Sequence, residues 1–236
     1  MIRFTNLSKR YGALNVLHDI NLQVSAGRIT AIIGPNGSGK TTLIKTLLGH
    51  VKPDQGIIRV DSETLNGDWE YRRRIGYMPQ LAQFPDHLNI SEIIDMVKDI
   101  RGAETNIDDE LFYLFKLDQE LKKPIRTLSG GTRQKLNAVI AFLFKPDILV
   151  LDEPTSGLDP LASGKLKAKI KRVREDGKLV LLTSHMISEL EELCDSIVFI
   201  LEGQIRFQGP IKNLLAHVKE SRLEKAIAML MEDVAA

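Results

Sequence analysis

The stretch GPNGSGKT at residues 34–41 constrains the fold of this 236-residue chain more than any other part of its sequence. A short apolar run at residues 29–33 precedes it, and residues 42–48 carry apolar side chains at helical intervals. A strand, a glycine-rich loop and a helix in this order form the context that the phosphate-loop pattern, GxxxxGK followed by Ser or Thr, requires. The sequence therefore predicts a buried strand that leads through a phosphate-binding loop into a helix.

The residues of this loop have the chemistry of a nucleoside triphosphate site. Gly34, Gly37 and Gly39 allow backbone N–H groups to turn toward one centre at a helix N-terminus, which attracts an anion. Lys40 is expected to reach the β- and γ-phosphates, and the hydroxyl of Thr41 is expected to ligate Mg²⁺. A glycine-rich turn with a purely structural role is the alternative interpretation. The predicted nucleotide contacts of the loop are Gly34, Pro35, Asn36, Gly37, Ser38, Gly39, Lys40, Thr41 and Thr42.

Length and composition favour one sizeable α/β domain with room for an inserted subdomain. Hydrophobic residues make up 43% of the chain, as in ordinary soluble globular proteins, and the net charge of +1 lacks the basic excess of a nucleic-acid-binding protein. The single cysteine, Cys194, excludes an internal disulfide and fits a reducing compartment. We expect no N-terminal secretory signal, and no apolar run approaches the ~20 residues that span a bilayer. Membrane association is therefore expected through another chain.

Segments of strand character lie on both sides of the phosphate loop. Residues 2–4, 13–17 and 20–24 alternate between apolar and polar side chains, with turns at residues 11–12 and 26–27, which predicts an antiparallel β-layer. Beyond residue 146, strands and helices alternate, which predicts a mostly parallel sheet. The expected elements there are strands at 148–151, 179–183, 197–201 and 204–207, and helices at about 160–174 and 186–193.

Helical periodicity replaces the strand pattern in residues 82–145. Asn89 is expected to cap a helix there, because it stands three residues before Glu92. The spacing of apolar residues in the C-terminal stretch, residues 211–236, also favours helical structure, which could pack on the chain's own core or on a partner. We predict an ATP-binding core at 1–81 and 146–210, an inserted helical subdomain at 82–145 and a C-terminal helical tail at 211–236.

A second cluster of residues narrows the kind of phosphate-loop protein. The run LSGGT at residues 128–132 leads into a predicted helix, and an apolar strand at 148–151 ends in Asp152 and Glu153. The carboxylate of Asp152 can hold the hydration shell of Mg²⁺, and Glu153 stands one residue further on, where it can polarise an attacking water. A loop start or a helix cap is the structural alternative for this acidic pair.

With LSGG and LDEP motifs at this spacing, the chain resembles an ATP-binding cassette (ABC) ATPase over essentially its whole length. The resemblance implies a head-to-tail homodimer that binds ATP and Mg²⁺ between the phosphate loop of one copy and Ser129, Gly130 and Gly131 of the other. A helix that starts at these residues offers a second anion-binding terminus, which the chain's own phosphate loop does not need. ATP would then favour the closed dimer more than ADP does, and such differential affinity drives a conformational switch.

The resemblance also assigns roles to four residues outside these motifs. It implies that Tyr11 stacks on adenine, that Gln80 contacts Mg²⁺ and the lytic water, and that His185 senses the γ-phosphate. Asp159 matches a loop that crosses the dimer interface, and because it precedes a proline it also fits a helix N-cap. The other three have structural alternatives as a strand tyrosine, a solvated loop glutamine and a strand-end histidine. The implied catalytic residues are Glu153, His185 and Gln80, and the implied Mg²⁺ ligands are Thr41, Gln80 and Asp152.

Three sequence segments indicate a branch of the family. SGGTRQKLNA, GYMPQLAQFPD and TSHMISELEELCD look closest to ATPases of ABC-2 type transporters and, among these, are similar to the ATPase subunit of the copper-processing NosDFY transporter. Thr132 stands where many family members have glutamine, and Ile140 replaces a frequent arginine. ATPases of other ABC-2 exporters, for drugs, lipids or polysaccharides, are the alternative.

The motifs together predict the motor subunit of a membrane transporter. We expect the chain in the cytoplasm, on the inner face of the membrane, where ATP hydrolysis in a homodimer drives integral membrane subunits and, through the complex, a periplasmic or secreted partner. A chromosome or repair ATPase is disfavoured, because about ninety residues separate Lys40 from Ser129 and show no sustained heptads. An importer ATPase is an alternative within transport. Neither a nucleic-acid partner nor a transition-metal site is expected, and the cargo cannot be inferred from this chain.

Overall fold

The computed structural model describes residues 1–65, 67, 69–102 and 107–232. Residues 103–106 of the predicted helical subdomain and 233–236 of the predicted tail lie outside the described residues. Within the described ranges, no helix combines the length and apolar character needed to cross a bilayer.

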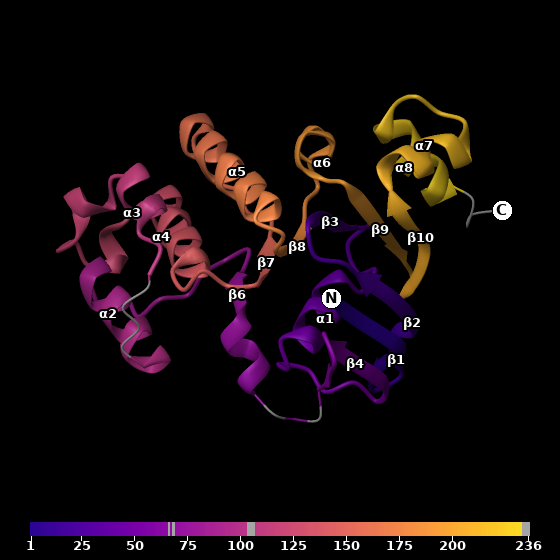
Figure 1. The fold of residues 1–236 in the computed structure, drawn as a ribbon, viewed down its shortest axis with the longest axis horizontal. Helices are drawn as coiled ribbons and strands as arrows, with labels where there is room; N and C mark the ends of the chain where they lie inside the picture. Colours follow the sequence, from indigo (N-terminus) through magenta and orange to yellow (C-terminus); the bar gives the residue numbers. More distant parts are fainter. Residues whose placement is uncertain (66, 68, 103–106, 233–236) are drawn as a thin grey trace.

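The core of the molecule is a six-stranded sheet in the order β10-β9-β3-β8-β7-β6 (Figure 1). The β9–β10 pair is antiparallel and the other neighbouring pairs are parallel. Strands β3, β7 and β8 are almost continuously apolar, as expected of strands covered on both faces. This sheet confirms the predicted α/β fold. Its strands are β3 (Arg28–Ile33), β6 (Ile75–Met78), β7 (Ile148–Asp152), β8 (Leu179–Thr183), β9 (Ser196–Leu201) and β10 (Gln204–Pro210).

A four-stranded antiparallel sheet in the order β2-β1-β4-β5 confirms the predicted N-terminal β-layer. Helix α1 (Lys40–Leu47) buries Leu43, Ile44 and Leu47 in a hydrophobic core that includes side chains of both sheets. The start of α1 is therefore held in place by both layers. The strands of this sheet are β1 (Ile2–Tyr11), β2 (Leu14–Val24), β4 (Gln55–Val60) and β5 (Glu63–Thr64).

The structure corrects one strand prediction. The separate strands expected at 13–17 and 20–24 form one continuous strand, β2, which passes through Asp19 in a left-handed conformation with φ of 50°. Asn6 on β1 has the same φ, and its Nδ2 donates to Asp19 Oδ1 at 2.7 Å beside a shift in the register of the two strands. A bulge of this kind bends a strand and interrupts its alternation without ending it. The interrupted alternation therefore predicts two short strands where the chain forms one bent strand.

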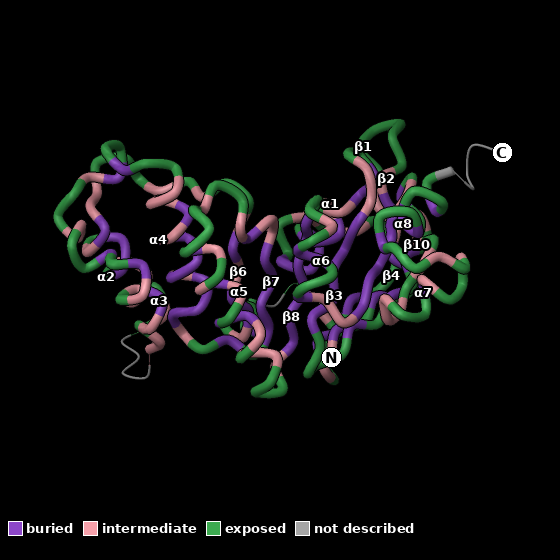
Figure 2. Tube along the Cα trace, turned by 90° about the horizontal axis from the view of Figure 1, so that it is seen from above, coloured by how far each residue is buried: buried purple, intermediate pink, exposed green. Residues whose placement is uncertain are grey.

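Helices α2, α3 and α4 pack together at one end of the molecule and are called the helical part below (Figures 1 and 2). Asn89 caps α2 as predicted, since its side chain accepts from Glu92 N at 3.0 Å while Glu92 Oε2 accepts from Asn89 N at 2.8 Å. Ile90, Ile93 and Ile94 are buried, so this face of α2 belongs to the core. The elements are α2 (Ile90–Arg101), α3 (Glu110–Leu114), α4 (Gly130–Phe142) and the 3-10 helices η2 (Leu117–Glu120) and η3 (Ile125–Thr127), and η1 (Glu70–Arg74) precedes β6.

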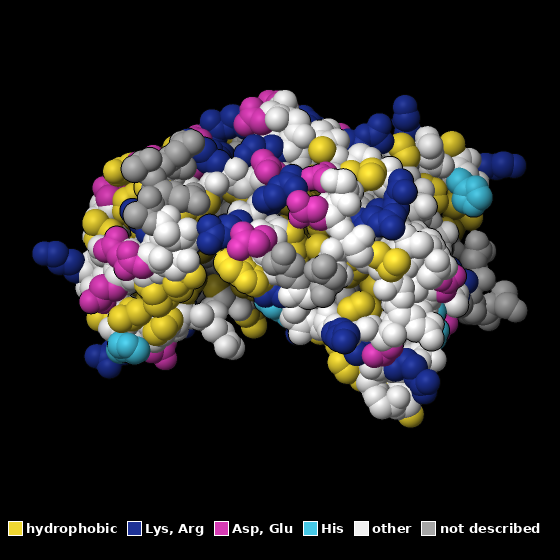
Figure 3. All heavy atoms as spheres, turned by 60° about the horizontal axis from the view of Figure 1, so that its bottom comes forward, with side chains coloured by type: hydrophobic (Ala, Val, Ile, Leu, Met, Phe, Trp, Pro, Cys, Tyr) yellow, Lys and Arg dark blue, Asp and Glu magenta, His cyan; other side chains and the backbone are white. Residues whose placement is uncertain are grey.

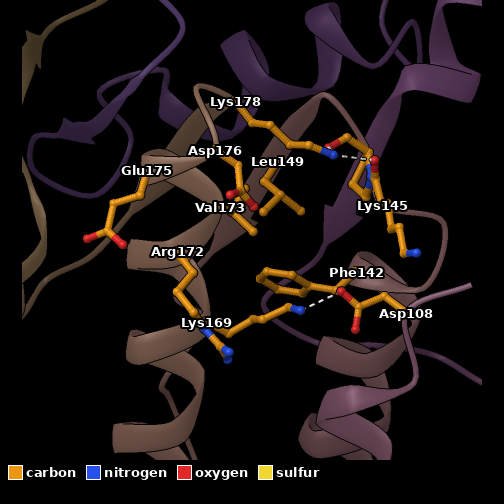
Figure 4. Close-up of a pocket in the computed structure, with 11 residues that line it drawn as sticks. Asp108, Phe142, Lys145, Leu149, Lys169, Arg172, Val173, Glu175, Asp176 and Lys178 are labelled. Carbon is orange, nitrogen blue, oxygen red and sulfur yellow. Dashed lines mark hydrogen bonds and ion pairs between the residues drawn. The ribbon is translucent and has the colours of Figure 1, made fainter.

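A cluster of charged side chains connects the helical part to α5 (Pro160–Glu175) of the core (Figure 4). Lys169 on α5 is only 8% exposed and pairs with Asp108 and, at 2.8 Å, with Glu110. Arg172, almost one turn further along α5, pairs with the other oxygen of Glu110. Burial opposes the charge of Lys169, but its hydrogen bonds with the two carboxylates outweigh burial and raise its pKa. Asp108, Lys169 and Arg172 line a cavity of about 470 Å³.

The C-terminal tail packs on the chain's own core, which decides between the two possibilities that the sequence leaves open. Its described residues form the helices α7 (Ile211–Val218) and α8 (Leu223–Glu232). Their buried side chains join the same hydrophobic cluster as the large sheet, and α8 contacts α6 (Ile187–Leu193) while α7 contacts β10. In Figure 1 the tail lies beside β9 and β10, at the opposite end of the molecule from the helical part.

Candidate active site

The phosphate loop joins β3 to α1 and has a backbone conformation that requires glycine. Gly34, Gly37 and Gly39 have φ values of 150°, 80° and 107°, a region that side-chain-bearing residues rarely adopt. A Cβ on Gly34 would lie 2.0 Å from the carbonyl oxygen of Ile200 on β9, which excludes any other residue at this position. Because such glycines turn successive N–H groups toward one centre, the loop has the form of an anion-binding nest at the N-terminus of α1.

Lys40 and Ser38 supply polar side chains to this loop. The Nζ of Lys40 donates to the carbonyl oxygens of Gly34 at 2.7 Å and Pro35 at 2.9 Å, so the ammonium lies across the loop. Burial lowers the pKa of Lys40, although the carboxylates of Asp152 and Glu153, at the end of β7, act in the opposite direction. The buried Ser38 Oγ has no hydrogen-bond partner within the described part of the chain. A partly desolvated ammonium and an unpaired buried hydroxyl beside a glycine nest fit a bound phosphate group.

Two of the three residues predicted to hold Mg²⁺, Thr41 and Asp152, lie next to the loop. Thr41 is exposed in the first turn of α1, followed by the half-buried Thr42, and Asp152 ends β7. The Thr183 hydroxyl at the end of β8 donates to Asp152 Oδ1 and thereby orients this carboxylate. The charge of Asp152 acts on Lys40, which places the carboxylate close to the phosphate loop. A hydroxyl and a carboxylate are the hard oxygen donors that Mg²⁺ prefers, so the residues present fit the ion.

Tyr11 occupies the end of β1 and is 48% exposed, with Lys9 Nζ 5.4 Å from the centre of its ring. It pairs with Leu14 across the β1–β2 hairpin. A few residues further along β2, the Val16 carbonyl oxygen lies so near Gly39 that a Cβ there would approach it to 2.8 Å. The aromatic ring is therefore on the hairpin that borders the phosphate loop, and it offers an exposed face to a planar ligand.

Gln80, Glu153 and His185 meet beyond the ends of the adjacent parallel strands β6, β7 and β8. Gln80 Nε2 donates to Glu153 Oε2 at 3.0 Å, and His185 Nε2 lies 3.1 Å from Glu153 Oε1. Glu153 has a left-handed φ of 49°, and its backbone N–H donates to Thr183 Oγ1 at 3.1 Å. Neighbouring parallel strands end at the same edge of the sheet, which brings these three distant residues together. A carboxylate oriented in this way can accept a proton from a water molecule.

The LSGG residues form the start of α4. Ser129 is the N-cap, and its Oγ accepts from the backbone N–H of Thr132 at 3.1 Å. Ser129 and Gly130 are exposed, and Gly131 is half-buried. Both views of the fold show α4 away from α1, and no hydrogen bond among the described residues joins Ser129 to the phosphate loop (Figures 1 and 2). Within one chain the starts of α1 and α4 therefore remain separate.

Asp159 combines two contacts. It caps α5 by accepting from Ala162 N at 2.8 Å, as the structural alternative predicts, and it pairs with Lys135 Nζ on α4 at 2.8 Å. The hydrogen bond from Lys135, followed by that from Ala162, lowers the pKa of Asp159. This pair joins the loop after β7 to the LSGG helix. Lys135 cannot be identified from the sequence, because a lysine in a polar helical stretch gives no signal of its partner.

Asn137 is a second residue that sequence reasoning missed. It is buried on α4, and its Nδ2 donates to the carbonyl oxygen of Pro79 at 2.7 Å. Because Pro79 directly precedes Gln80, the LSGG helix is connected to the loop that carries the predicted catalytic glutamine. An asparagine within the largely apolar run LNAVIAF of residues 136–142 is the sequence signal that could have identified it, because a polar side chain in such a run needs a partner.

Residues 17–156 match the family model described as ABC transporter. This chain belongs to the ABC transporter ATP-binding family. As a member of that family, it binds ATP and hydrolyses it. The matched range contains the phosphate loop, the LSGG residues, Asp152 and Glu153, which are the same features that the structure arranges around β3, α1, α4 and β7.

Two relatives of this chain are described as ATP-binding proteins of export or transport. The Nod factor export ATP-binding protein I of Ralstonia nicotianae is 34% identical to this ABC ATPase over 216 residues, which cover 89% of this chain and 67% of the relative. The lantibiotic transport ATP-binding protein SrtF of Streptococcus pyogenes is 33% identical over 207 residues, which cover 87% of this chain and 89% of the relative.

Solved structures share the fold over nearly the whole chain. One described as an ATP binding subunit of an ABC transporter has a TM-score of 0.92 at 29% identity, covering 98% of this ABC ATPase and 99% of that chain. An ATP-binding cassette solved as a dimer in a post-hydrolysis state with ADP and phosphate has a TM-score of 0.79 at 24% identity, covering 89% of this chain and 98% of that chain. The second likeness concerns the fold alone.

Proposed function

We propose that this ABC ATPase is the motor subunit of an ABC-2 type exporter and works as a head-to-tail homodimer. The observation that carries the proposal is the separation of two anion-binding helix starts, at Gly39–Lys40 and at Ser129–Gly130, within one chain. A second copy in the opposite orientation would bring the LSGG residues of each chain to the phosphate loop of the other. A related cassette solved as a dimer, and relatives described as export and transport proteins, support this assignment.

In the proposed mechanism, the phosphate loop binds the triphosphate through its backbone N–H groups and through Lys40. Glu153 accepts the proton of the attacking water, while Gln80 and His185 hold its carboxylate in position. Thr41, Asp152 and Gln80 would hold Mg²⁺, which would neutralise phosphate charge when bound. ATP that contacts both copies stabilises the closed dimer, and loss of the γ-phosphate removes that contact and reopens it.

We place the membrane subunits at the junction between the helical part and the core. A cavity of about 250 Å³ lies there, with His50, Arg72, Tyr77, Val97 and Phe144 among its lining residues. On the face shown in Figure 3, hydrophobic side chains gather over the helical end of the molecule. A short helix of a membrane subunit would fit this junction, and closure of the dimer would then move that helix. Because the chain uses ATP, the proposed location is the inner face of the cell membrane.

The cargo follows from the partner subunits and not from this chain. The relatives are described as exporting Nod factor and transporting lantibiotics, so we propose an exported organic molecule as the cargo class. Membership of a copper-processing transporter of the NosDFY type, with a periplasmic partner, stays a prediction that rests on the three sequence segments alone.

Dimerisation by ATP tests the proposal directly. The Glu153→Gln variant of the full chain should bind ATP and Mg²⁺, lose turnover and elute as a dimer in light scattering, whereas the wild-type chain with ADP should remain monomeric. Adding Ser129→Arg should prevent the dimer without weakening nucleotide binding to the monomer, because Ser129 does not contact the chain's own loop. The control is Ser221→Arg, the same substitution at an exposed position between α7 and α8. A dimer that persists with Ser129→Arg would refute the head-to-tail arrangement.

A further inference from the structure

Glu189 on α6 is a buried carboxylate that none of the predicted site roles uses. It is only 1% exposed and lies four residues after His185. Its Oε1 accepts from the Thr155 hydroxyl at 2.8 Å, and its Oε2 accepts from the Ser184 hydroxyl. No ion pair to Glu189 occurs among the residues that the structure describes. Because burying a carboxylate is costly, the two hydroxyl hydrogen bonds are what makes this position tolerable.

The two hydroxyls belong to the two loops that carry the candidate catalytic groups. Thr155 stands two residues after Glu153 in the loop that follows β7. Ser184 directly precedes His185 in the loop that follows β8, and its Oγ also accepts from the backbone N–H of Met186 at 3.1 Å. The carboxylate of Glu189 therefore bridges both loops, while Glu153 and His185 face each other at 3.1 Å.

Thr183 makes a second connection near these loops, but it does not reach the loop that holds His185. Thr183 joins Asp152 and Glu153 to β8 through its hydroxyl, but it lies within the strand and precedes the loop that holds His185. Beyond Thr183, the described residues connect the two loops in two ways, through the contact of His185 with Glu153 and through the hydrogen bonds that Glu189 accepts from Thr155 and Ser184. The imidazole of His185 is half exposed, with 51% of its side chain accessible, so its own packing does little to fix it.

We propose that Glu189 is a positioning residue for ATP hydrolysis, which holds the Glu153 loop and the His185 loop in register. This rests on the proposed roles of Glu153 and His185. Charge-assisted hydrogen bonds are stronger than neutral ones, and a carboxylate can accept from two hydroxyls at once. A glutamine of the same shape has one acceptor oxygen, so it can keep only one of the two bonds with the same polarity. Loss of one bond should let the loops shift relative to each other.

The steady-state kinetics of the full chain test the proposal. Glu189→Gln should lower kcat about ten- to a hundredfold, as displacement of a catalytic group does, with KM for ATP within about twofold of wild type because the phosphate loop is untouched. Glu191→Gln is the matched control, since it makes the same change at an exposed position of the same helix and should leave both constants unchanged. Thr155→Val should lower kcat, whereas Thr155→Ser, which retains the hydroxyl, should keep kcat near the wild-type value.

A double-variant cycle separates positioning from general destabilisation. The effects of Glu189→Gln and Ser184→Ala on kcat should be less than additive when combined, because both break the same bridge. If Glu189→Gln does not fold, the Thr155→Val and Thr155→Ser pair gives the answer alone. Equal kcat values for Glu189→Gln and Glu191→Gln, or for Thr155→Val and Thr155→Ser, would overturn the inference, as would a raised KM with unchanged kcat. Those outcomes leave the proposed function intact provided that Glu153→Gln still blocks turnover and traps the dimer. Wild-type turnover by Glu153→Gln would instead refute the proposed function itself.

Discussion

Replacing Lys169 by methionine should weaken the attachment of the helical part to α5. The Lys169 side chain is 10% exposed and pairs with Asp108, which is 16% exposed, and with Glu110, which is 35% exposed. Methionine fills a similar apolar volume but leaves the Asp108 carboxylate, which the helical part holds close to α5, without its ammonium. Glu110 keeps its partner Arg172, so the loss falls mainly on Asp108.

The expected cost follows from this burial. Removing one partner of a fully buried ion pair costs about 3–5 kcal/mol, and most exposed pairs contribute about 0–1 kcal/mol. Because Lys169 and Asp108 are mostly buried and Glu110 remains paired, we expect about 2–3 kcal/mol for Lys169→Met. The matched control is Lys167→Met on the same helix, since Lys167 pairs with Glu192, whose side chain is 45% exposed. That change should cost less than about 1 kcal/mol.

Urea unfolding followed by circular dichroism measures both variants. Lys169→Met should shift the midpoint clearly below that of Lys167→Met, and a separate early transition would indicate that the helical part detaches first. Equal midpoints for the two variants would refute the argument that burial makes this cluster important.

The same cluster predicts a dependence on pH. Burial opposes ionisation of Glu110, but hydrogen bonds from Lys169 and Arg172 outweigh it and lower its pKa below the ordinary 4.5. Its contribution to stability is therefore present above pH 4.5 and is lost as the pH falls through the lowered value. The raised pKa of Lys169 acts oppositely, and its contribution is present below pH 10.5 and lost as the pH rises through the raised value. Lys169→Met should show a shallower loss of stability below pH 4.5 than wild type, and parallel curves would contradict this reasoning.

Three further predictions concern single positions. Gly34→Ala should abolish ATP binding and lower the free energy of unfolding by at least about 3 kcal/mol, because its Cβ would lie 2.0 Å from a backbone oxygen. Gly164→Ala on α5 is the control and should be tolerated, because open space surrounds that position. Unfolding midpoints and nucleotide titration distinguish the two variants. Lys40→Ala should weaken ATP binding at least about a hundredfold, measured with a fluorescent nucleotide, while Lys45→Ala at an exposed position of α1 should not. Burial, followed by the nearby acidic charges, raises the pKa of the Cys194 thiol, so iodoacetamide at pH 8 should label it far more slowly in the native chain than in urea, and equal rates would contradict its burial.

Much of the site could be predicted because its chemistry is encoded in short segments. The phosphate loop occupies eight consecutive residues, and the cap of α2 depends on Asn89 and Glu92, three positions apart. In both cases a side chain, that of Lys40 or of Asn89, bonds to backbone groups a few residues away, so local sequence determines the geometry. The strand runs that end at Asp152 and Thr183 identify buried strands for the same reason. The roles of Gln80 and His185 came from family resemblance, and their contact with Glu153 became visible in the fold.

Tertiary structure decided the features that depend on distant partners. The sequence does not show that Lys169 meets Asp108, that Lys135 meets Asp159, or that Glu189 bridges the loops after β7 and β8, because each contact depends on how α4, α5 and α6 pack against one sheet. The bend in β2 and the packing of the tail on its own core are of the same kind. A polar side chain in a helix has the same local pattern whether its partner is water or a residue sixty positions away, and the packing of the whole chain determines which one it meets.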